Sequence, residues 1–215
     1  MKIILLGPSG SGKGTLADFI RKDFGVPHVS TGDLFRDNVA RKTPLGILVK
    51  EQIAAGLWVS DDITMRMLMD RLGEEDAQCG CIIDGVPRTM TQVWMLDANV
   101  NVDLVIELDV SDEIVIDRLT SRYVCKDCKT NHNIKLGPVD ACRKCSGELY
   151  QREDDCAEAI AFRLKQFRSS LGDIKKHYDE KGLLLSIPVT DDMLPHEIYR
   201  RVEASLRDKG IFPTC

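Results

Sequence analysis

Short apolar runs alternate along the chain with stretches in which apolar residues recur every three or four positions. The runs are aliphatic and do not alternate with polar residues, which predicts strands buried on both faces, at 3–6, 81–84, 104–108 and 183–187. The periodic stretches predict helices at 14–23, 61–72, 89–97, 112–121, 157–180 and 192–207. Strands alternating with helices predict an α/β fold, with a parallel sheet covered by helices on both faces.

Two segments interrupt this alternation and are interpreted as insertions. Residues 30–59 have a helical pattern with no convincing strand, and residues 122–155 are polar, rich in turns and contain cysteines in two close pairs. The expected core therefore consists of residues 1–29, 60–121 and 156–215.

Composition and charge narrow the class of protein. The chain has 215 residues, of which 43% are hydrophobic, and its net charge is −5, which is typical of a soluble globular protein. An acidic balance disfavours broad contact with nucleic acid or anionic membranes. The apolar run at 3–6 is too short for a signal peptide, and no other stretch approaches the roughly 18 apolar residues of a membrane span. We therefore expect a cytoplasmic protein with reduced thiols and no nucleic-acid or membrane partner.

A glycine-rich loop follows the first predicted strand and leads into a helix. Its sequence is Gly7-Pro8-Ser9-Gly10-Ser11-Gly12-Lys13-Gly14-Thr15. Glycines let backbone N–H groups turn toward phosphate oxygens, the helix N-terminus adds partial positive charge, and Lys13 adds a full one. The order strand, loop, Gly-Lys, helix predicts a phosphate-binding P-loop.

The loop departs from the general P-loop pattern at the residue after Lys13. Gly14 stands where that pattern has a hydroxyl residue, and the hydroxyl comes one position later, at Thr15. We therefore expect Mg²⁺ to be held by phosphates and water, with Asp84, at the end of a predicted strand, orienting those waters.

Six motifs resemble the nucleoside monophosphate kinases, and the adenylate kinases in particular. Gly-Lys-Gly-Thr at 12–15 is the loop spelling of that family. The other motifs are Ser30-Thr31-Gly32-Asp33-Leu34-Phe35-Arg36, Gly56-Leu57-Trp58-Val59-Ser60-Asp61, Asp84-Gly85-Val86-Pro87-Arg88-Thr89 with Gln92, Arg118-Leu119-Thr120-Ser121-Arg122, and Arg152-Glu153-Asp154-Asp155 with Arg163. Val86, Ser60 and Ser121 replace phenylalanine, proline and glycine of the family pattern.

The resemblance implies a fold and a reaction. The fold is the three-layer P-loop fold, with a helical monophosphate-binding lobe at 30–59 and a zinc-containing lid at 122–155. The reaction is ATP + AMP ⇌ 2 ADP, with Mg²⁺ as cofactor and a monomer as the working unit.

The resemblance also implies residue roles. Residues that would bind ATP are Gly10, Ser11, Gly12, Lys13, Gly14, Thr15, Arg118, Arg122 and, by its backbone, Met193. Residues that would bind AMP are Thr31, Arg36, Leu57, Trp58, Val59, Gly85, Val86, Pro87, Arg88, Gln92, Arg152 and Arg163. Among these, Lys13, Arg88, Arg122, Arg152 and Arg163 would be catalytic, and Asp154 would be a hinge contact of the lid.

The choice of base leaves alternatives open. Thr31 and Gln92 look like the residues that read adenine. Alternatively, Thr31 could cap a helix that begins near Gly32 and Gln92 could face solvent, and Thr31 could both cap the helix and read the base. A kinase for UMP, CMP or GMP would use the same phosphate chemistry. A non-catalytic nucleotide-sensing or nucleic-acid-binding module on the same fold is a third interpretation, which the arginine set and the acidic charge disfavour.

Four of the eight cysteines have the spacing of a metal site. Cys125-x₂-Cys128 and Cys142-x₂-Cys145 lie on either side of a loop, as in tetrahedral thiolate sites. Zinc is the default metal and iron an alternative, and disulfides would form only in oxidised protein. His132 could replace one cysteine. Because all four ligands come from the protein, we expect a structural metal with no role in the chemistry.

Overall fold

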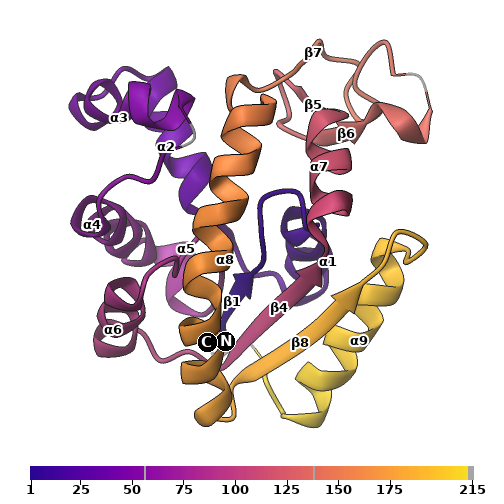
Figure 1. Cartoon of the computed structure of the whole chain (residues 1–215). Coiled ribbons are helices and arrows are strands. Elements are labelled where there is room, and N and C mark those ends of the chain that lie inside the picture. The colour runs from indigo at the N-terminus through magenta and orange to yellow at the C-terminus, as the bar shows by residue number, and fades with distance from the viewer. Residues whose placement is uncertain (56, 138, 213–215) are drawn as a thin grey trace.

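The computed structural model describes residues 1–55, 57–137 and 139–212. Gly56, which opens one of the six motifs, and Cys215 lie outside the described residues. The main sheet is fully parallel, with strand order β2-β3-β1-β4-β8. Figure 1 shows β1, β4 and β8 side by side. Its strands are β1 (Lys2–Leu6), β2 (His28–Ser30), β3 (Cys81–Asp84), β4 (Leu104–Val110) and β8 (Leu184–Val189).

The four predicted strands are confirmed within a few residues, whereas β2 was not predicted. With only three residues, β2 is too short to produce a recognisable apolar run. Its pairing with β3 places Ser30 beside Asp84, so β2 ends at the same edge of the sheet as β3.

Helices cover both faces of the sheet and match all six predicted helical patterns. The last helix begins at Pro195 instead of residue 192, because proline is favoured in the first turn and has no N–H to lose there. The helices of the core are α1 (Lys13–Phe24), α4 (Asp61–Leu72), α5 (Glu75–Gln78), α6 (Met90–Asn99), α7 (Asp112–Thr120), α8 (Ala157–Glu180) and α9 (Pro195–Asp208).

The central strand β1 explains the three layers. Its side chains alternate between two hydrophobic clusters, so Ile3 and Leu5 pack with residues of α1 and α9, while Ile4 and Leu6 pack with residues of α4 and α6. Because both faces are buried, the strand is continuously apolar, as expected of a parallel sheet. The α/β three-layer prediction is therefore confirmed.

The segment expected to be the first insertion is helical. It contains α2 (Thr31–Ala40) and α3 (Pro44–Ala54), which pack against each other around a small cluster that includes Phe35, Val49 and Val59. The helix cap of α2 is Ser30, whose Oγ accepts a hydrogen bond from the backbone N–H of Asp33 at 3.3 Å. The alternative that Thr31 caps this helix is therefore wrong.

The segment 122–155 carries a small antiparallel sheet of its own. The strand order is β6-β5-β7, formed by β5 (Arg122–Cys125), β6 (Asn131–Asn133) and β7 (Leu149–Tyr150). Two short 3₁₀ turns follow the strands, η1 (Ile134–Leu136) and η2 (Glu153–Asp155). Strands of two to four residues leave no periodic signal, which is why only a turn-rich segment was predicted.

A buried ion pair joins the two ends of this segment. Arg122 donates through Nε and Nη2 to the two carboxylate oxygens of Asp155, at 2.8 and 2.5 Å. The Asp155 side chain is fully buried, and the Arg122 side chain is only 14% exposed. Residues 122 and 155 are thereby held together where the segment leaves and rejoins the core.

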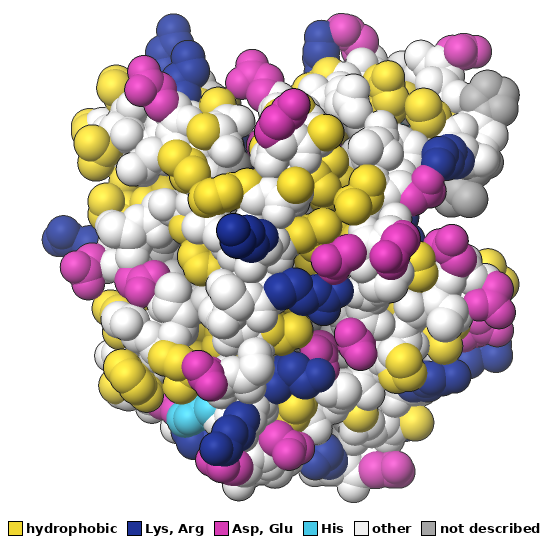
Figure 2. Space-filling view, viewed as in Figure 1, with side chains coloured by type: hydrophobic (Ala, Val, Ile, Leu, Met, Phe, Trp, Pro, Cys, Tyr) yellow, Lys and Arg dark blue, Asp and Glu magenta, His cyan; other side chains and the backbone are white. Residues whose placement is uncertain are grey.

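Charges of both signs share the surface of the protein. Acidic and basic side chains are interspersed over the face shown in Figure 2. Within the described ranges, no helix is both long and apolar enough to cross a membrane. Cys79 is disulfide-bonded, so the expectation that all thiols are reduced is wrong at this position.

The buried pair leads to a stability prediction. Replacing Asp155 with Ala should destabilise the protein by about 3–5 kcal/mol, because the buried guanidinium of Arg122 loses its partner. The control is Glu148→Ala, since Glu148 pairs with Lys126 in the same segment but is 71% exposed. That exposed pair should contribute at most about 1 kcal/mol. Urea unfolding of both variants measures the difference, and equal losses would contradict the prediction.

Candidate functional site

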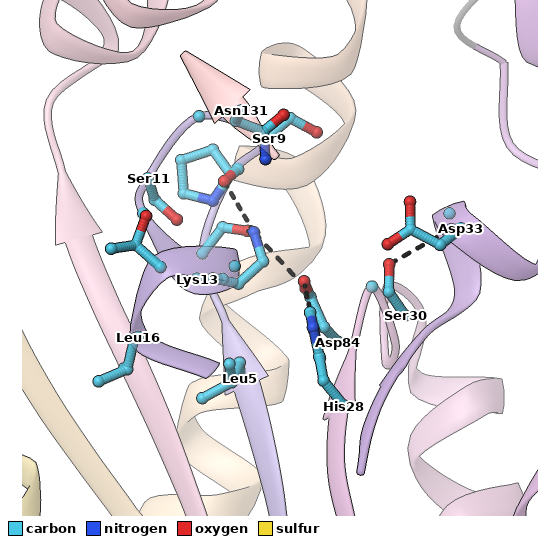
Figure 3. Close-up of a pocket in the computed structure, with 18 of the residues that line it drawn as sticks. Leu5, Ser9, Ser11, Lys13, Leu16, His28, Ser30, Asp33, Asp84 and Asn131 are labelled. Atoms are coloured by element: carbon cyan, nitrogen blue, oxygen red, sulfur yellow. Dashed lines mark hydrogen bonds and ion pairs between the residues drawn. The ribbon is translucent and has the colours of Figure 1, made fainter. Parts of the chain in front are cut away.

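The glycine-rich loop lies at the carboxyl edge of the parallel sheet, where the order of the strands reverses and such folds place their ligands. It connects the end of β1 to α1, and Gly12 adopts φ 103° immediately before the helix, a left-handed conformation that favours glycine. The Lys13 ammonium donates to the carbonyl oxygens of Gly7 at 2.7 Å and Pro8 at 2.9 Å (Figure 3). The loop therefore brings the N-terminus of α1 and the Lys13 ammonium close together at this edge of the sheet.

Asp84 lies between Lys13 and His28, as Figure 3 shows. Its Oδ1 is 3.8 Å from Lys13 Nζ, and its Oδ2 is 3.3 Å from His28 Nε2. Burial works to raise the pKa of Asp84, but the nearby Lys13 and His28 outweigh it and hold that pKa below its ordinary value. Burial also lowers the pKa of Lys13, against the attraction of Asp84.

His28 was not among the predicted site residues. It belongs to β2, and the parallel pairing of β2 with β3 brings it to Asp84 across 56 residues of sequence. If β2 had been recognised as a strand, its pairing with β3 would have placed His28 beside Asp84.

Arg88 is held against the backbone that follows β3. Its Nε donates to the carbonyl oxygen of Gly85 at 2.8 Å, and its guanidinium carbon lies 5.7 Å from the centre of the Trp58 ring. Burial lowers the pKa of Arg88 despite the attraction of Asp84. Gly85 has φ +93°, and a Cβ there would lie 2.3 Å from Thr31 Oγ1, so glycine is required.

Two further arginines approach from the segments expected to be insertions. Arg36, on α2, donates to Asp33 at 2.6 Å. Burial opposes ionisation of Asp33, but Arg36 holds its pKa below the ordinary value. Burial lowers the pKa of Arg152 to about 10, and repulsion from Arg36 and Arg122 adds to this effect.

Arg163 occupies the start of α8. Its Nη1 donates to Asp154 Oδ2 at 2.5 Å, and its Nη2 lies 3.3 Å from Asp155 Oδ1. The Nε atoms of Arg152 and Arg163 are buried and have no hydrogen-bond partner among the described residues. Asp33, which pairs with Arg36, and Asp155, which pairs with Arg122 and Arg163, were not predicted as site residues, although both lie within the quoted motifs.

Gln92 and Thr31 are buried, with exposed fractions of 2% each. Thr31 Oγ1 donates to the carbonyl oxygen of Asp84 at 3.3 Å. Gln92 Oε1 accepts from the backbone N–H of Arg88 at 2.7 Å, and its Nε2 donates to Asp61 at 2.7 Å. The alternative that Gln92 faces solvent is therefore wrong.

One cavity of about 1380 Å³ collects the predicted nucleotide-site residues. Arg118 lines it as well, with Nη1 3.4 Å from the carbonyl oxygen of Ser11. The predicted site residues along its walls are Gly10, Ser11, Gly12, Lys13, Gly14, Thr15, Thr31, Arg36, Leu57, Trp58, Val59, Asp84, Gly85, Val86, Pro87, Arg88, Gln92, Arg118, Arg122, Arg152, Arg163 and Met193.

The arrangement is suited to binding anions. Lysine and arginine side chains converge from the P-loop, from β3 and from both segments flanking the cavity, and burial strengthens their interaction with charge. Guanidinium groups match phosphate oxygens geometrically. The cavity is therefore both large and cationic, as the binding of phosphorylated molecules requires.

The four predicted cysteine ligands also come together. The sulfur atoms of Cys125, Cys128, Cys142 and Cys145 all lie within 4.8 Å of one another, and the pairs Cys125–Cys145 and Cys128–Cys142 are 3.5 Å apart. Zinc–sulfur bonds of about 2.3 Å give a tetrahedron with edges of roughly 3.8 Å, so the cluster fits a tetrathiolate metal. His132 is buried, with Nε2 3.3 Å from Cys142 Sγ.

Comparison of the sequence with known proteins identifies its family. The adenylate kinase family model matches residues 5–183. A curated adenylate kinase of Symbiobacterium thermophilum is 41% identical over 215 residues, which cover 95% of this chain and all of the relative. Adenylate kinases of Clostridium kluyveri (37% identity over 96% of this chain and 98% of the relative) and Thermoanaerobacter sp. strain X514 (38% over 98% and 100%) are similar along nearly their whole length. The chain belongs to the adenylate kinase family.

Proposed function

We propose that this protein transfers a phosphoryl group reversibly between adenine nucleotides, ATP + AMP ⇌ 2 ADP. The observation that carries the proposal is the single cavity in which a P-loop faces a cluster of arginines. Membership of the adenylate kinase family supports it. We also propose that the monomer is the working unit, as the resemblance to the family implies.

The chemistry of the substrates explains why this cavity is rich in cations. The second pKa of a phosphate monoester is about 6, so the attacking oxygen of a monophosphate is largely ionised at neutral pH. No general base is then required. What the protein supplies instead is alignment of two anions and neutralisation of the charge that spreads over the transferred group.

We assign the two ends of the cavity to the two substrates. Lys13 and the glycine-rich loop hold the ATP phosphates together with Arg122, and Arg118 lies against the adenine of ATP. Arg36 and Arg88 hold the phosphate of AMP, and Thr31 and Gln92 read its base. Arg152 and Arg163 serve the transferred group between them. The hydrogen bonds of these side chains to the backbone and to carboxylates support the assignment, because they orient the cations before substrate arrives.

Mg²⁺ bound with ATP would add charge neutralisation at the phosphates. Asp84 is the carboxylate suited to orient its waters, since it lies at the end of β3 beside Lys13, and its lowered pKa keeps it ionised near neutral pH. Thr15 and Gly14, which depart from the general P-loop order, both line the same cavity.

One assay tests the acceptor. ADP formation from ATP is measured with AMP, UMP, CMP and GMP in turn, and AMP should be the preferred acceptor by a wide margin. Preference for another monophosphate would mean that this nucleotide is the acceptor, with the same mechanism of transfer. Absence of turnover with all four would favour a nucleotide sensor.

We also propose that the cysteine cluster holds a structural zinc ion. Four thiolates complete the coordination, which leaves no position for a reacting water. The sheet of segment 122–155 has strands of two to four residues and a small core, so a metal is a physically reasonable source of its stability.

Arg88 provides the first test of the mechanism. Arg88→Ala should lower turnover by about 10³-fold or more, because a guanidinium on the transferred charge is lost. Arg41→Ala is the control, since the Arg41 side chain is 69% exposed and pairs with the neighbouring Asp37 on α2. Steady-state rates are measured after circular dichroism has verified the fold of both variants. Near-normal turnover of Arg88→Ala would remove Arg88 from the mechanism.

Cysteine substitutions test the metal. Cys145→Ser should bind less zinc and melt at a lower temperature, at about 2–4 °C per kcal/mol lost for a chain of this size. Cys156→Ser is the matched control, because Cys156 is also exposed and free but lies outside the cluster. Metal analysis and thermal unfolding of both variants provide the readouts. Equal metal content and equal melting temperatures would contradict a zinc site.

A further inference from the structure

Asp61 takes part in a closed hydrogen-bond network around Gln92. One carboxylate oxygen of Asp61 accepts from Gln92 Nε2 at 2.7 Å, and the other accepts from Thr89 Oγ1 at 2.7 Å. Thr89 Oγ1 in turn accepts from the backbone N–H of Gln92 at 3.1 Å. Asp61 is the first residue of α4 and Thr89 caps α6, so the network also connects two helices.

This network determines which way the amide of Gln92 faces. A backbone N–H can only donate, so the group opposite the N–H of Arg88 must be the amide oxygen. A carboxylate can only accept, so the group opposite Asp61 must be the amide nitrogen. Reversing the amide would therefore place donor against donor at one end and acceptor against acceptor at the other.

Because its orientation is fixed, the amide of Gln92 presents its hydrogen-bond donor and acceptor to the cavity in one order only. After these two bonds, Gln92 keeps one N–H and one oxygen lone pair, and its side chain lines the cavity. Adenine offers an amino donor next to a ring-nitrogen acceptor, and an amide pairs with such a couple in one order only. Hypoxanthine, which has an oxygen and an N–H at the same positions, needs the reverse order.

We infer that Asp61 is a specificity-determining residue, which positions the amide of Gln92 so that the monophosphate site accepts a 6-amino purine and rejects a 6-oxo purine. The inference rests on the proposed function, in which Gln92 reads the base of AMP. Asp61 itself does not touch the base in this account. It acts through Gln92 and is a positioning residue.

A purely structural role for Asp61 predicts a different behaviour. Asp61 and Asp62 both lie in the first turn of α4, where negative charge stabilises a helix N-terminus. Asp62 is exposed, whereas Asp61 is partly buried in the network. Asp62→Ala therefore removes the same helix-end charge without disturbing Gln92.

The experiment is a double-mutant cycle on the full-length protein. The variants are Asp61→Ala, Gln92→Leu and the two combined, with Asp62→Ala as control and Asp61→Asn as the conservative variant. The kcat/KM for AMP at saturating ATP, the KM for ATP, and the rate with IMP are measured for each. AMP and IMP differ only at the two positions that the amide is proposed to read.

The expected result has three parts. Asp61→Ala should lose about tenfold or more in kcat/KM for AMP, because a buried amide donor is left unpaired, and its preference for AMP over IMP should fall by a similar factor. The KM for ATP should not change. In the Gln92→Leu background the same substitution should have no further effect, since coupled residues are not additive. Asp61→Asn keeps a carbonyl acceptor and should lie close to wild type.

Several outcomes would overturn the inference. These are additive losses in the double variant, an unchanged AMP-to-IMP preference in Asp61→Ala, equal losses in Asp62→Ala, or no effect of Gln92→Leu on AMP. Failure of the proposed function is distinguishable from all of these, because the wild-type protein itself would then show no turnover of AMP.

Discussion

The site must hold several buried cations close together against their mutual repulsion, and the rest of its structure meets this constraint. Lys13, Arg88 and Arg152 each have a pKa below the ordinary value, chiefly because burial disfavours their charge and neighbouring cations add to the effect. Carboxylates from separate parts of the chain offset this repulsion, among them Asp84 at the end of β3 and Asp33 on α2. The fold can therefore hold a surplus of positive charge, which a phosphorylated ligand would neutralise.

The sheet provides the geometry for that balance. Parallel strands end at one edge, so β1, β2 and β3 bring the P-loop, His28 and Asp84 together from distant parts of the sequence. The helical segment that follows β2 and the small sheet of 122–155 then add their arginines from either side. The meeting of parallel strand ends at one edge of the sheet thus gathers most of the charged groups into one cavity.

Features carried by local sequence could be predicted, and features carried by pairing across the fold could not. The continuously apolar strands, the long helix α8 and the motif residues lining the cavity all have signals within a few neighbouring residues. The bond of Gln92 to Asp61 spans 31 residues and that of Arg122 to Asp155 spans 33, so neither has a local signature. Strand β2 was missed because three residues do not form a pattern. The cap at Ser30 has a local signal, but the next residue, Thr31, is also a capping residue type.

The buried ion pair between Arg122 and Asp155 has a consequence for conformational entropy. The pair holds the two ends of segment 122–155 together, and the four cysteine sulfurs lie close to one another inside the segment. Fixing the backbone of a flexible residue costs about 1–2 kcal/mol, so each residue of the segment that is already ordered lowers the entropic cost of binding a ligand by about that amount. A segment ordered in advance leaves that free energy available for aligning the reacting phosphates.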